Sequence, residues 1–280
     1  MSQSQRFNQG KEKQENGDLH GAILDFEAEI AENPQNPTAY SSLGEIYAQL
    51  GKWEKAKSCY SKLILFEPSD RNYFLLGESL YQSGHSIQAV EAFRMSLRDN
   101  PNLLESHLAL ATLYGNSGNQ YKKELYLKNA LILDESNELV MEELISVYSK
   151  TFRFQEAVEL CQNYLLFYPE ATQIKILLIE LLMRMEKFNS SFEYLSICMN
   201  EDPNVHKAIL ASDPAKKDTI RKLLKKKKKR LLNSLADHPD PRLAVDLSIL
   251  FLLYGDIYHS AKYLVYARQL KERIQMASSN

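Results

Sequence analysis

The chain has 280 residues and a formal net charge of −2, and its 44% hydrophobic and 25% charged residues are ordinary for a soluble globular protein. Sparse glycine and proline, with plentiful leucine, lysine, glutamate and alanine, favour helix. Residues 1–16 lack the apolar core of a secretory signal, and no uncharged apolar run approaches the roughly 20 residues that span a bilayer. We therefore expect a helical, cytoplasmic protein.

A fixed period runs through the first three quarters of the chain. Its intervals are 34, 33, 34, 34 and 34 residues, and its markers are Pro34, Pro68, Pro101, Glu135, Pro169 and Pro203. Glu135 takes the place of the expected proline. A constant period of this length is typical of stacked supersecondary units.

Within one period, the pattern predicts two helices. A first apolar-periodic helix contains Gly44, a break follows at Gly51, and a second helix contains Ala56 and Tyr60 and ends at Pro68. Small residues such as Gly44 and Ala56 are expected where the two helices cross closely, with bulky residues filling the space beside them.

This pattern of Leu-Gly, Tyr, Ala, an aromatic residue and Pro resembles the tetratricopeptide repeat family. We place six such units within residues 1–205, at 3–36, 37–69, 70–103, 104–137, 138–171 and 172–205. The resemblance implies an all-α fold, a right-handed superhelical solenoid of antiparallel helix pairs. Lys123, Ile145 and Ile179 replace small residues of the pattern, so we expect wider helix spacing there.

The remaining residues fit the repeat less well. Residues 206–240 are predicted to form an atypical segment with a basic amphipathic helix at 216–236. Residues 241–280 are predicted to form a degenerate helix pair that caps the array.

Residues that could perform catalysis or bind a metal are missing from the pattern. Cys59, Cys161 and Cys198 are far apart and show no Cys-x-x-Cys spacing, and the six histidines are scattered. No nucleophile, phosphate-binding or dinucleotide-binding motif is present. We predict no catalytic residue, no metal, no cofactor and no enzymatic activity.

The resemblance implies that a partner protein's peptide or helix binds in a concave groove lined by the first helix of each unit. The implied groove residues are Glu45, Gln49, Arg71, Glu78, Tyr81, Gln82, Thr112, Asn116, Glu142, Glu143, Ser146, Glu180, Met183 and Arg184. Five glutamates against two arginines make this surface acidic, and a merely solvated helix face is the alternative. No oligomeric state is predicted.

Chaperone-binding members of the family hold a peptide's terminal carboxylates with Lys, Asn and Arg side chains. The corresponding positions here are Phe7, Lys11, Ser42, Arg71 and Leu75, so this clamp is not assembled. An acidic C-terminal tail is therefore a poor candidate ligand.

The segment from Lys216 to Arg230 holds ten basic residues and one acid, a charge of +9, which leaves 24 basic and 35 acidic residues, or −11, elsewhere. Its central cations are Lys222, Lys225, Lys226, Lys227, Lys228, Lys229 and Arg230. Leucines at 224, 231 and 235 continue a helical apolar stripe with Ile220, and the stems of Lys227 and Lys228 are expected to lie along apolar surface.

Four interpretations of this basic helix stay open. It could be a solvated face whose leucines pack on the preceding repeat, or it could contact acidic surface within the chain or on a partner. It could instead bind an anionic membrane or nucleic acid, or serve as a nuclear import signal. An adaptor that contacts an anionic surface is thus the alternative to the groove-binding scaffold. The lack of aromatic residues at 216–236 weakens the nucleic-acid interpretation.

Overall fold

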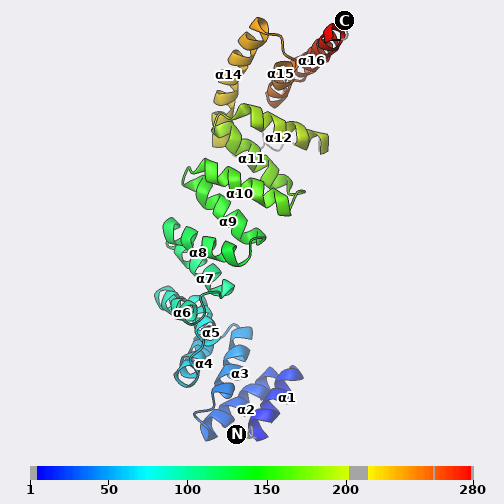
Figure 1. The fold of residues 1–280 in the computed structure, drawn as a ribbon. Coiled ribbons are helices and arrows are strands. Elements are labelled where there is room, and N and C mark those ends of the chain that lie inside the picture. The colour runs from blue at the N-terminus through cyan, green and yellow to red at the C-terminus, as the bar shows by residue number, and fades with distance from the viewer. Residues whose placement is uncertain (1–4, 202–213, 255, 279–280) are drawn as a thin grey trace. The chain divides into compact units, whose positions relative to one another are not determined.

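The computed structural model describes residues 5–201, 214–254 and 256–278. Every regular element within these ranges is an α-helix, fifteen in number (Figure 1). The predicted all-α fold of helix pairs is confirmed, because successive helices joined by short turns pack against each other. The predicted segment boundaries at 205 and 240 stay predictions, and Pro203 lies outside the described residues.

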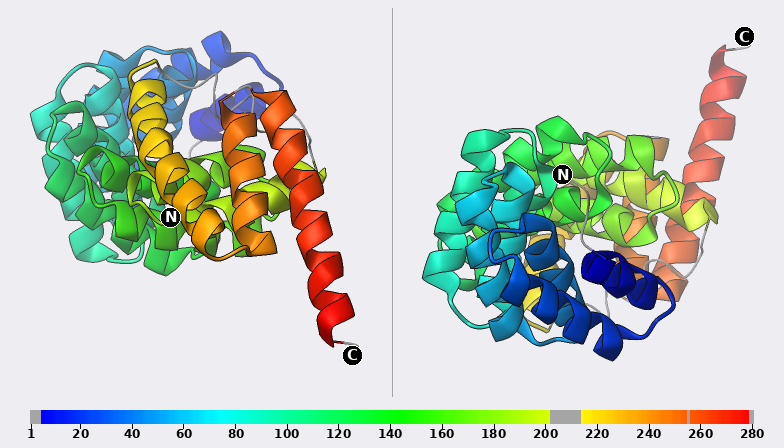
Figure 2. Two further views of the ribbon diagram at one scale, coloured as in Figure 1. Left: turned by 90° about the horizontal axis from the view of Figure 1, so that it is seen from above. Right: turned by 90° about the horizontal axis from the view of Figure 1, so that it is seen from below.

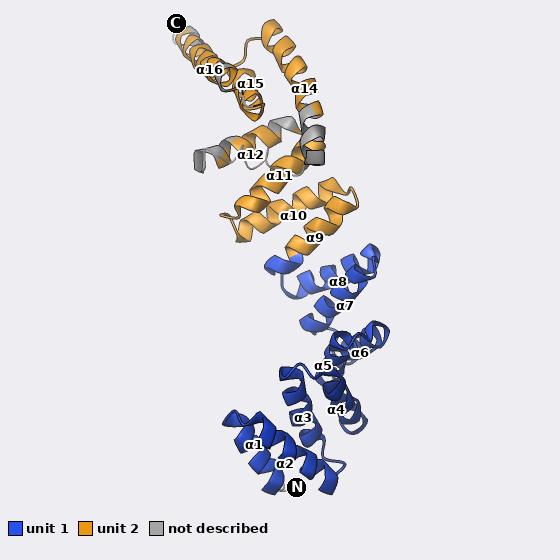
Figure 3. Cartoon of the chain, turned by 180° about the vertical axis from the view of Figure 1, so that it is seen from behind, with its two compact units in different colours: residues 1–140 blue, residues 141–280 orange. Residues whose placement is uncertain are grey.

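The chain divides into two compact units, residues 1–140 and 141–280 (Figure 3). Unit 1 contains α1 (Gln5–Glu15), α2 (Leu19–Glu32), α3 (Pro37–Gln49), α4 (Trp53–Phe66), α5 (Asp70–Gln82), α6 (Ser86–Asp99), α7 (Leu104–Asn116) and α8 (Gln120–Leu133). Helix α9 (Glu138–Lys150) begins at the end of unit 1 and continues into unit 2. The later helices of unit 2 are α10 (Phe154–Phe167), α11 (Thr172–Arg184), α12 (Phe188–Glu201), α14 (Pro214–Asp237), α15 (Pro241–Leu253) and α16 (Ile257–Ser278).

Local side chains set where several helices begin. The Asn36 side chain accepts a hydrogen bond from the backbone of Thr38 at 3.2 Å, and Pro37 occupies the first helical position of α3. Ser69 caps α5 in the same way, accepting from the backbone of Asn72 at 3.2 Å. Such caps satisfy backbone N–H groups that have no partner within the helix.

The crossing of the two helices in each early pair depends on a glycine facing an aromatic ring. A Cβ atom on Gly44 would lie 2.7 Å from the Tyr60 ring, and one on Gly77 would lie 2.7 Å from the Phe93 ring. Real Cβ contacts are not this short, so glycine is required where the ring lies against the helix backbone. The expected close crossing at Gly44 is confirmed.

Later pairs change the sizes of these two residues, always at a separation of sixteen positions. The pairs in chain order are Gly10 and Phe26, Gly44 and Tyr60, Gly77 and Phe93, Ala111 and Leu127, Ile145 and Cys161, and Ile179 and Leu195. All twelve residues are buried. The aromatic second residue occurs only with glycine, and a larger first residue is accompanied by Leu or Cys, as close packing favours. This exchange opposes the wider helix spacing expected at Ile145 and Ile179, which stays a prediction.

The turn inside each pair uses a left-handed backbone conformation at one position. Glycine occupies it in unit 1, with φ of +68° at Gly51 and +77° at Gly118. In unit 2 the corresponding residues are Phe152, with φ of 60°, and Glu186, with φ of 57°. An L side chain is strained in this region, so unit 2 carries backbone strain that the glycines of unit 1 avoid.

Each unit has its own hydrophobic core. The core of unit 1 extends from Phe7 to Leu113, and the core cluster of unit 2 joins side chains of α11, α12, α14, α15 and α16. Figure 2 shows α15 between α14 and α16, and α15 contacts both. The basic helix α14 is thus part of the core packing of unit 2 and also contacts α11.

The size exchange predicts energetic coupling between its two positions. Gly77→Ile should overpack the Phe93 ring and destabilise unit 1 by about 1 to 3 kcal/mol. Adding Phe93→Cys should recover part of this loss, with a coupling energy of roughly 1 to 3 kcal/mol in a double-mutant cycle measured by urea unfolding. Gly77→Ile combined with Phe26→Cys, a change in another helix pair, should be additive. If the effects of Gly77→Ile and Phe93→Cys on stability were also additive, the proposed size exchange between these two positions would be contradicted.

The turn at Phe152 offers a second measurement. Because φ is 60° there, Phe152→Gly should exceed Phe152→Ala in thermal stability by roughly 0.5 to 1 kcal/mol. Both variants remove the 78% exposed ring and its contact with Phe154, so their difference isolates the backbone. Gly118→Ala should lower thermal stability for the same reason, because φ is +77° there. An alanine variant as stable as the glycine variant at 152 would refute the strain.

Candidate functional site

The structure places the predicted groove residues on odd-numbered helices of both units. Eight of them lie in unit 1 and are exposed or half-buried: Glu45 and Gln49 on α3, Arg71, Glu78, Tyr81 and Gln82 on α5, and Thr112 and Asn116 on α7. Six of them form two rows of equivalent positions in successive repeats. One row is Glu45, Glu78 and Thr112, and the other is Gln49, Gln82 and Asn116. The two rows therefore offer mostly carboxylates and amides.

Charged residues of α3 and α5 act electrostatically on one buried tyrosine. Tyr60, on α4, is 1% exposed, and burial raises the pKa of its hydroxyl. The carboxylates of Glu45 and Glu78 raise this pKa further, whereas the Arg71 guanidinium acts in the opposite direction. Side chains from two successive first helices thus influence the same hydroxyl.

A hydrogen bond links the next two first helices. The Asn116 amide donates to the Tyr81 hydroxyl at 3.0 Å, and α5 contacts α7. The Thr112 hydroxyl donates to its own helix, at the Leu108 carbonyl. Helices α3, α5 and α7 together carry four carboxylates and one Lys or Arg, which is Arg71. The acidic character expected of the groove stays a prediction.

A hollow of about 540 Å³ lies between α1 and α3. Phe7 and Ser42, which occupy clamp positions, are 3% exposed each, and Lys11 shares the hollow with Glu12 and Glu15. A peptide carboxylate would meet two carboxylates there. The hollow favours neutral or cationic groups.

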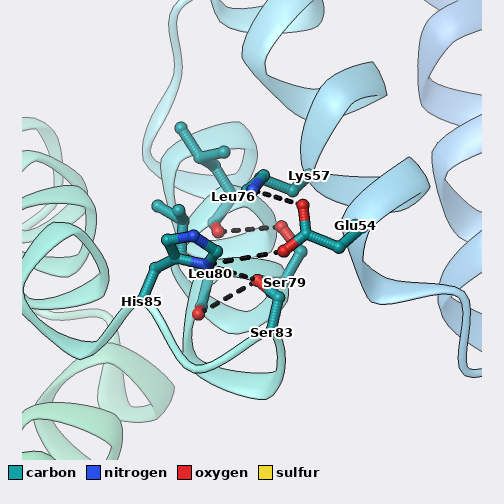
Figure 4. A network of polar contacts seen from close by, with 7 residues as sticks. All are labelled: Glu54, Lys57, Leu76, Ser79, Leu80, Ser83 and His85. Atoms are coloured by element: carbon teal, nitrogen blue, oxygen red, sulfur yellow. Dashed lines mark hydrogen bonds and ion pairs between the residues drawn. The ribbon is translucent and has the colours of Figure 1, made fainter.

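A polar network that sequence reasoning missed joins α4 to the turn after α5 (Figure 4). Glu54 pairs with Lys57 on its own helix and lies 3.6 Å from the His85 ring. The ring in turn lies 3.1 Å from the Ser83 hydroxyl, which donates to the Ser79 carbonyl at 2.7 Å. The hydrogen bond from Lys57 lowers the pKa of Glu54. The network ties two successive repeats together at their turns.

In unit 2, predicted groove residues surround a hollow of about 570 Å³ between α9 and α11. Apolar side chains of α11, including Ile174, Leu177 and Leu181, form part of its lining, together with Glu142 and Arg184. Three of the predicted residues differ from solvated groove positions, because Glu180 is 4% exposed, Met183 is fully buried and Glu143 is half-buried. Ser146 lines the hollow.

One face of the basic helix α14 is anchored in the core. Leu224, Leu231 and Leu235 are 0%, 3% and 7% exposed and belong to the core cluster of unit 2. At these positions the helix has a buried apolar face. The side chain of Ile220 lies outside the described residues.

Two lysines lie along this anchored face, as expected for long apolar stems. The Lys228 ammonium lies 4.3 Å from the centre of the Phe251 ring and 5.6 Å from that of Tyr254. Burial lowers the pKa of Lys227, and Asp246 on α15 opposes that shift. Burial likewise raises the pKa of Asp246 to about 6 against the effect of Lys227.

The opposite face of α14 is exposed and cationic. A hollow of about 490 Å³ on this face is lined by Lys222, Lys225, Lys226, Lys229, Arg230 and Asn233. Glu186 lies 3.2 Å from the Lys226 ammonium and 3.9 Å from the Arg230 guanidinium. Neither Glu186 nor Asp246 was among the predicted site residues, because both meet the helix through tertiary packing.

The described residues hold no cluster of His, Cys, Asp and Glu side chains arranged to bind a metal. The three cysteines are free and buried, and burial raises the pKa of the Cys59 thiol to about 11 and that of Cys161 to about 12. No helix in the described ranges combines the length and apolar character that crossing a membrane requires.

Comparison with known proteins gives short stretches of sequence similarity. A tetratricopeptide repeat family model matches residues 14–80. Protein CTR9 homolog of Arabidopsis thaliana is 34% identical over 91 residues, 32% of this chain and 8% of that protein. Superkiller protein 3 of Schizosaccharomyces pombe is 24% identical over 189 residues, and the match covers 62% of this chain and 13% of that protein. The chain thus spans a small fraction of these relatives' length.

Solved structures share the fold. A crystal structure of MamA protein covers 60% of this chain and 92% of its own length, with a TM-score of 0.56 and 18% identity. YrrB, described as a TPR protein with an unusual peptide-binding site, covers 60% of this chain and 88% of its own, with a TM-score of 0.53 and 15% identity. The glycine–aromatic crossings, the helix pairs and these matches agree: the chain has the fold of tetratricopeptide repeat proteins, and the match at residues 14–80 supports its membership of that family.

Proposed function

We propose that this protein is a non-catalytic scaffold that binds a segment of a partner protein along α3, α5 and α7 of unit 1. The observation that carries the proposal is that Glu45 and Glu78 occupy the same repeat position on α3 and α5, together with the Tyr81–Asn116 hydrogen bond that links α5 to α7. These side chains project from rigid helices at recurring repeat positions, so their spacing is fixed before a ligand arrives. Such preorganisation favours binding because less side-chain freedom is lost.

The charge of this surface defines the partner's chemistry. Helices α3, α5 and α7 carry four carboxylates and one arginine, and the hollow beside α1 adds the carboxylates of Glu12 and Glu15. A segment with Lys or Arg side chains matches these carboxylates, and the amides of Gln49, Gln82 and Asn116 can bond its backbone. An acidic segment would be repelled.

The hollow of unit 2 has a different chemistry from the surface of unit 1. Its lining combines the apolar side chains of Ile174, Leu177 and Leu181 with Glu142 and Arg184 at the polar positions. Apolar lining with few polar groups is typical of sites that hold an apolar anchor residue. We expect this hollow to accept a large apolar side chain of a bound segment.

The test measures binding of peptide pools that differ only in net charge. Glu45→Gln with Glu78→Gln should weaken binding of Lys/Arg-rich peptides by roughly 2- to 30-fold, because each exposed ion pair contributes about 0.2 to 1 kcal/mol. Acidic peptides should bind weakly to both proteins. Fluorescence anisotropy with labelled peptides gives the affinities.

The matched control removes two carboxylates from second helices, Glu32→Gln with Glu91→Gln, both exposed. It should leave peptide affinity unchanged, since the net charge rises by the same two units but the first-helix surface is intact. An equal loss in the control, or a preference of the native protein for acidic peptides, would overturn the proposal.

A further inference from the structure

The two faces of α14 have different chemistry. Leu224, Leu231 and Leu235 fix one face in the core of unit 2, and Lys227 and Lys228 lie along that side among partly buried groups. The outward face consists of exposed cations and one amide around the hollow of about 490 Å³. Because the leucines hold the helix, the outward cations are presented on a rigid support.

The outward side chains form two parallel rows along the helix. Their members are Lys222, Lys226 and Arg230 in one row and Lys225, Lys229 and Asn233 in the other. Residues four apart rise by about 6 Å along an α-helix, and they lie on one face. A chain of anions running along the hollow would therefore meet cations on both sides.

These cations have few acidic partners of their own. Glu186 pairs with Lys226 and Arg230, whereas no acid of the described residues lies within ion-pair distance of Lys222, Lys225 or Lys229. Residues 141–280 hold 21 basic and 17 acidic residues, a charge of +4, and residues 1–140 hold 13 and 19, a charge of −6. Like charges four residues apart repel each other, so the outward face favours an external polyanion.

Two kinds of anionic partner fit this face poorly. A membrane-surface helix inserts its apolar face into lipid, but the leucines of α14 are buried in the protein. A protein interface is centred on apolar and aromatic anchors and is depleted in charge, but none of the exposed large hydrophobic residues found in the described ranges lies on α14.

A nucleic-acid backbone requires only exposed cations, and the outward face of α14 provides them. Its phosphates bind Lys and Arg through release of condensed counterions, with no apolar contact. The outward face carries no aromatic side chain on which unpaired bases could stack, so it favours the backbone of a duplex over a single strand. Asn233 and Arg230 are the only side chains lining this hollow that have the hydrogen-bonding geometry to distinguish one base from another.

We propose that the outward face of α14 binds the phosphodiester backbone of duplex nucleic acid without sequence preference. Lys222, Lys225 and Lys229, which have no ion pair with an acid among the described residues, carry most of the contact. The interaction is separate from the peptide surface of unit 1, since it uses neither the residues nor the charge sign of that surface.

The test titrates the full chain into a labelled 24-base-pair DNA duplex, an RNA duplex and a DNA duplex of unrelated sequence, over a series of salt concentrations. For DNA, the logarithm of the association constant should fall linearly with the logarithm of the salt concentration, with a slope of about −0.9 for each phosphate contacted. Contacts from the five outward cations can therefore give a slope no steeper than about −4.5. Lys222→Gln, Lys225→Gln and Lys229→Gln together should reduce the slope's magnitude by about 2.7 and the affinity at low salt at least tenfold. The two DNA sequences should bind equally.

The matched control changes three exposed lysines elsewhere, Lys62→Gln, Lys262→Gln and Lys271→Gln, which should leave the slope unchanged. The three α14 lysines changed to Arg should retain binding, and helicity measured by circular dichroism should match in all variants. Equal loss in the control would overturn the proposal. So would binding to phosphatidylserine vesicles or a poly-glutamate peptide, but to no duplex, at low salt.

Discussion

The structure depends on one contact, between a residue of the first helix in each pair and its partner sixteen positions later. Where the first residue is Gly44, the Tyr60 ring lies against the helix backbone, and where it is Ile145, the partner is Cys161. The contact is local in sequence, so each pair can form its crossing alone, but one pair leaves apolar surface that only its neighbours cover. Stacking then repeats the same outward positions along the first helices.

That repetition makes a binding surface from residues that are distant in sequence. Glu45 and Glu78 both raise the pKa of Tyr60 because they occupy the same position of successive units, and Tyr81 meets Asn116 across 35 residues for a similar reason. The repeat scaffold therefore sets the spacing of the surface side chains, and the residue at each position sets the charge of the surface. The repeat position that holds Gln49, Gln82 and Asn116 in unit 1 holds Lys150 and Arg184 in unit 2. The two units therefore present different chemistry at the same repeat position.

The sequence predicted those parts of the structure that follow from local spacing. Helices, glycine crossings and the buried leucines of α14 are all visible as periodicity. The burial of Glu180, the pairing of Glu186 with Lys226 across 40 residues and the position of Asp246 beside Lys227 were not predictable. The last two depend on how α14 packs against α11 and α15, and the repeat pattern contains no information on a helix outside it. Phe152 at a left-handed turn was equally hidden, because the pattern there requires glycine.

The energetics of α14 explain how a strongly cationic helix can stay folded and still be available to a partner. Burial of Leu224, Leu231 and Leu235 contributes roughly 1.5 to 3 kcal/mol each, whereas the exposed pairs with Glu186 contribute about 0.2 to 1 kcal/mol each. Apolar packing therefore sets the helix position, and charge does not. Salt screens the outward cations without releasing the leucines, since screening acts on exposed charges and leaves apolar burial intact. A polyanion can thus bind and leave while the helix keeps its place in the core.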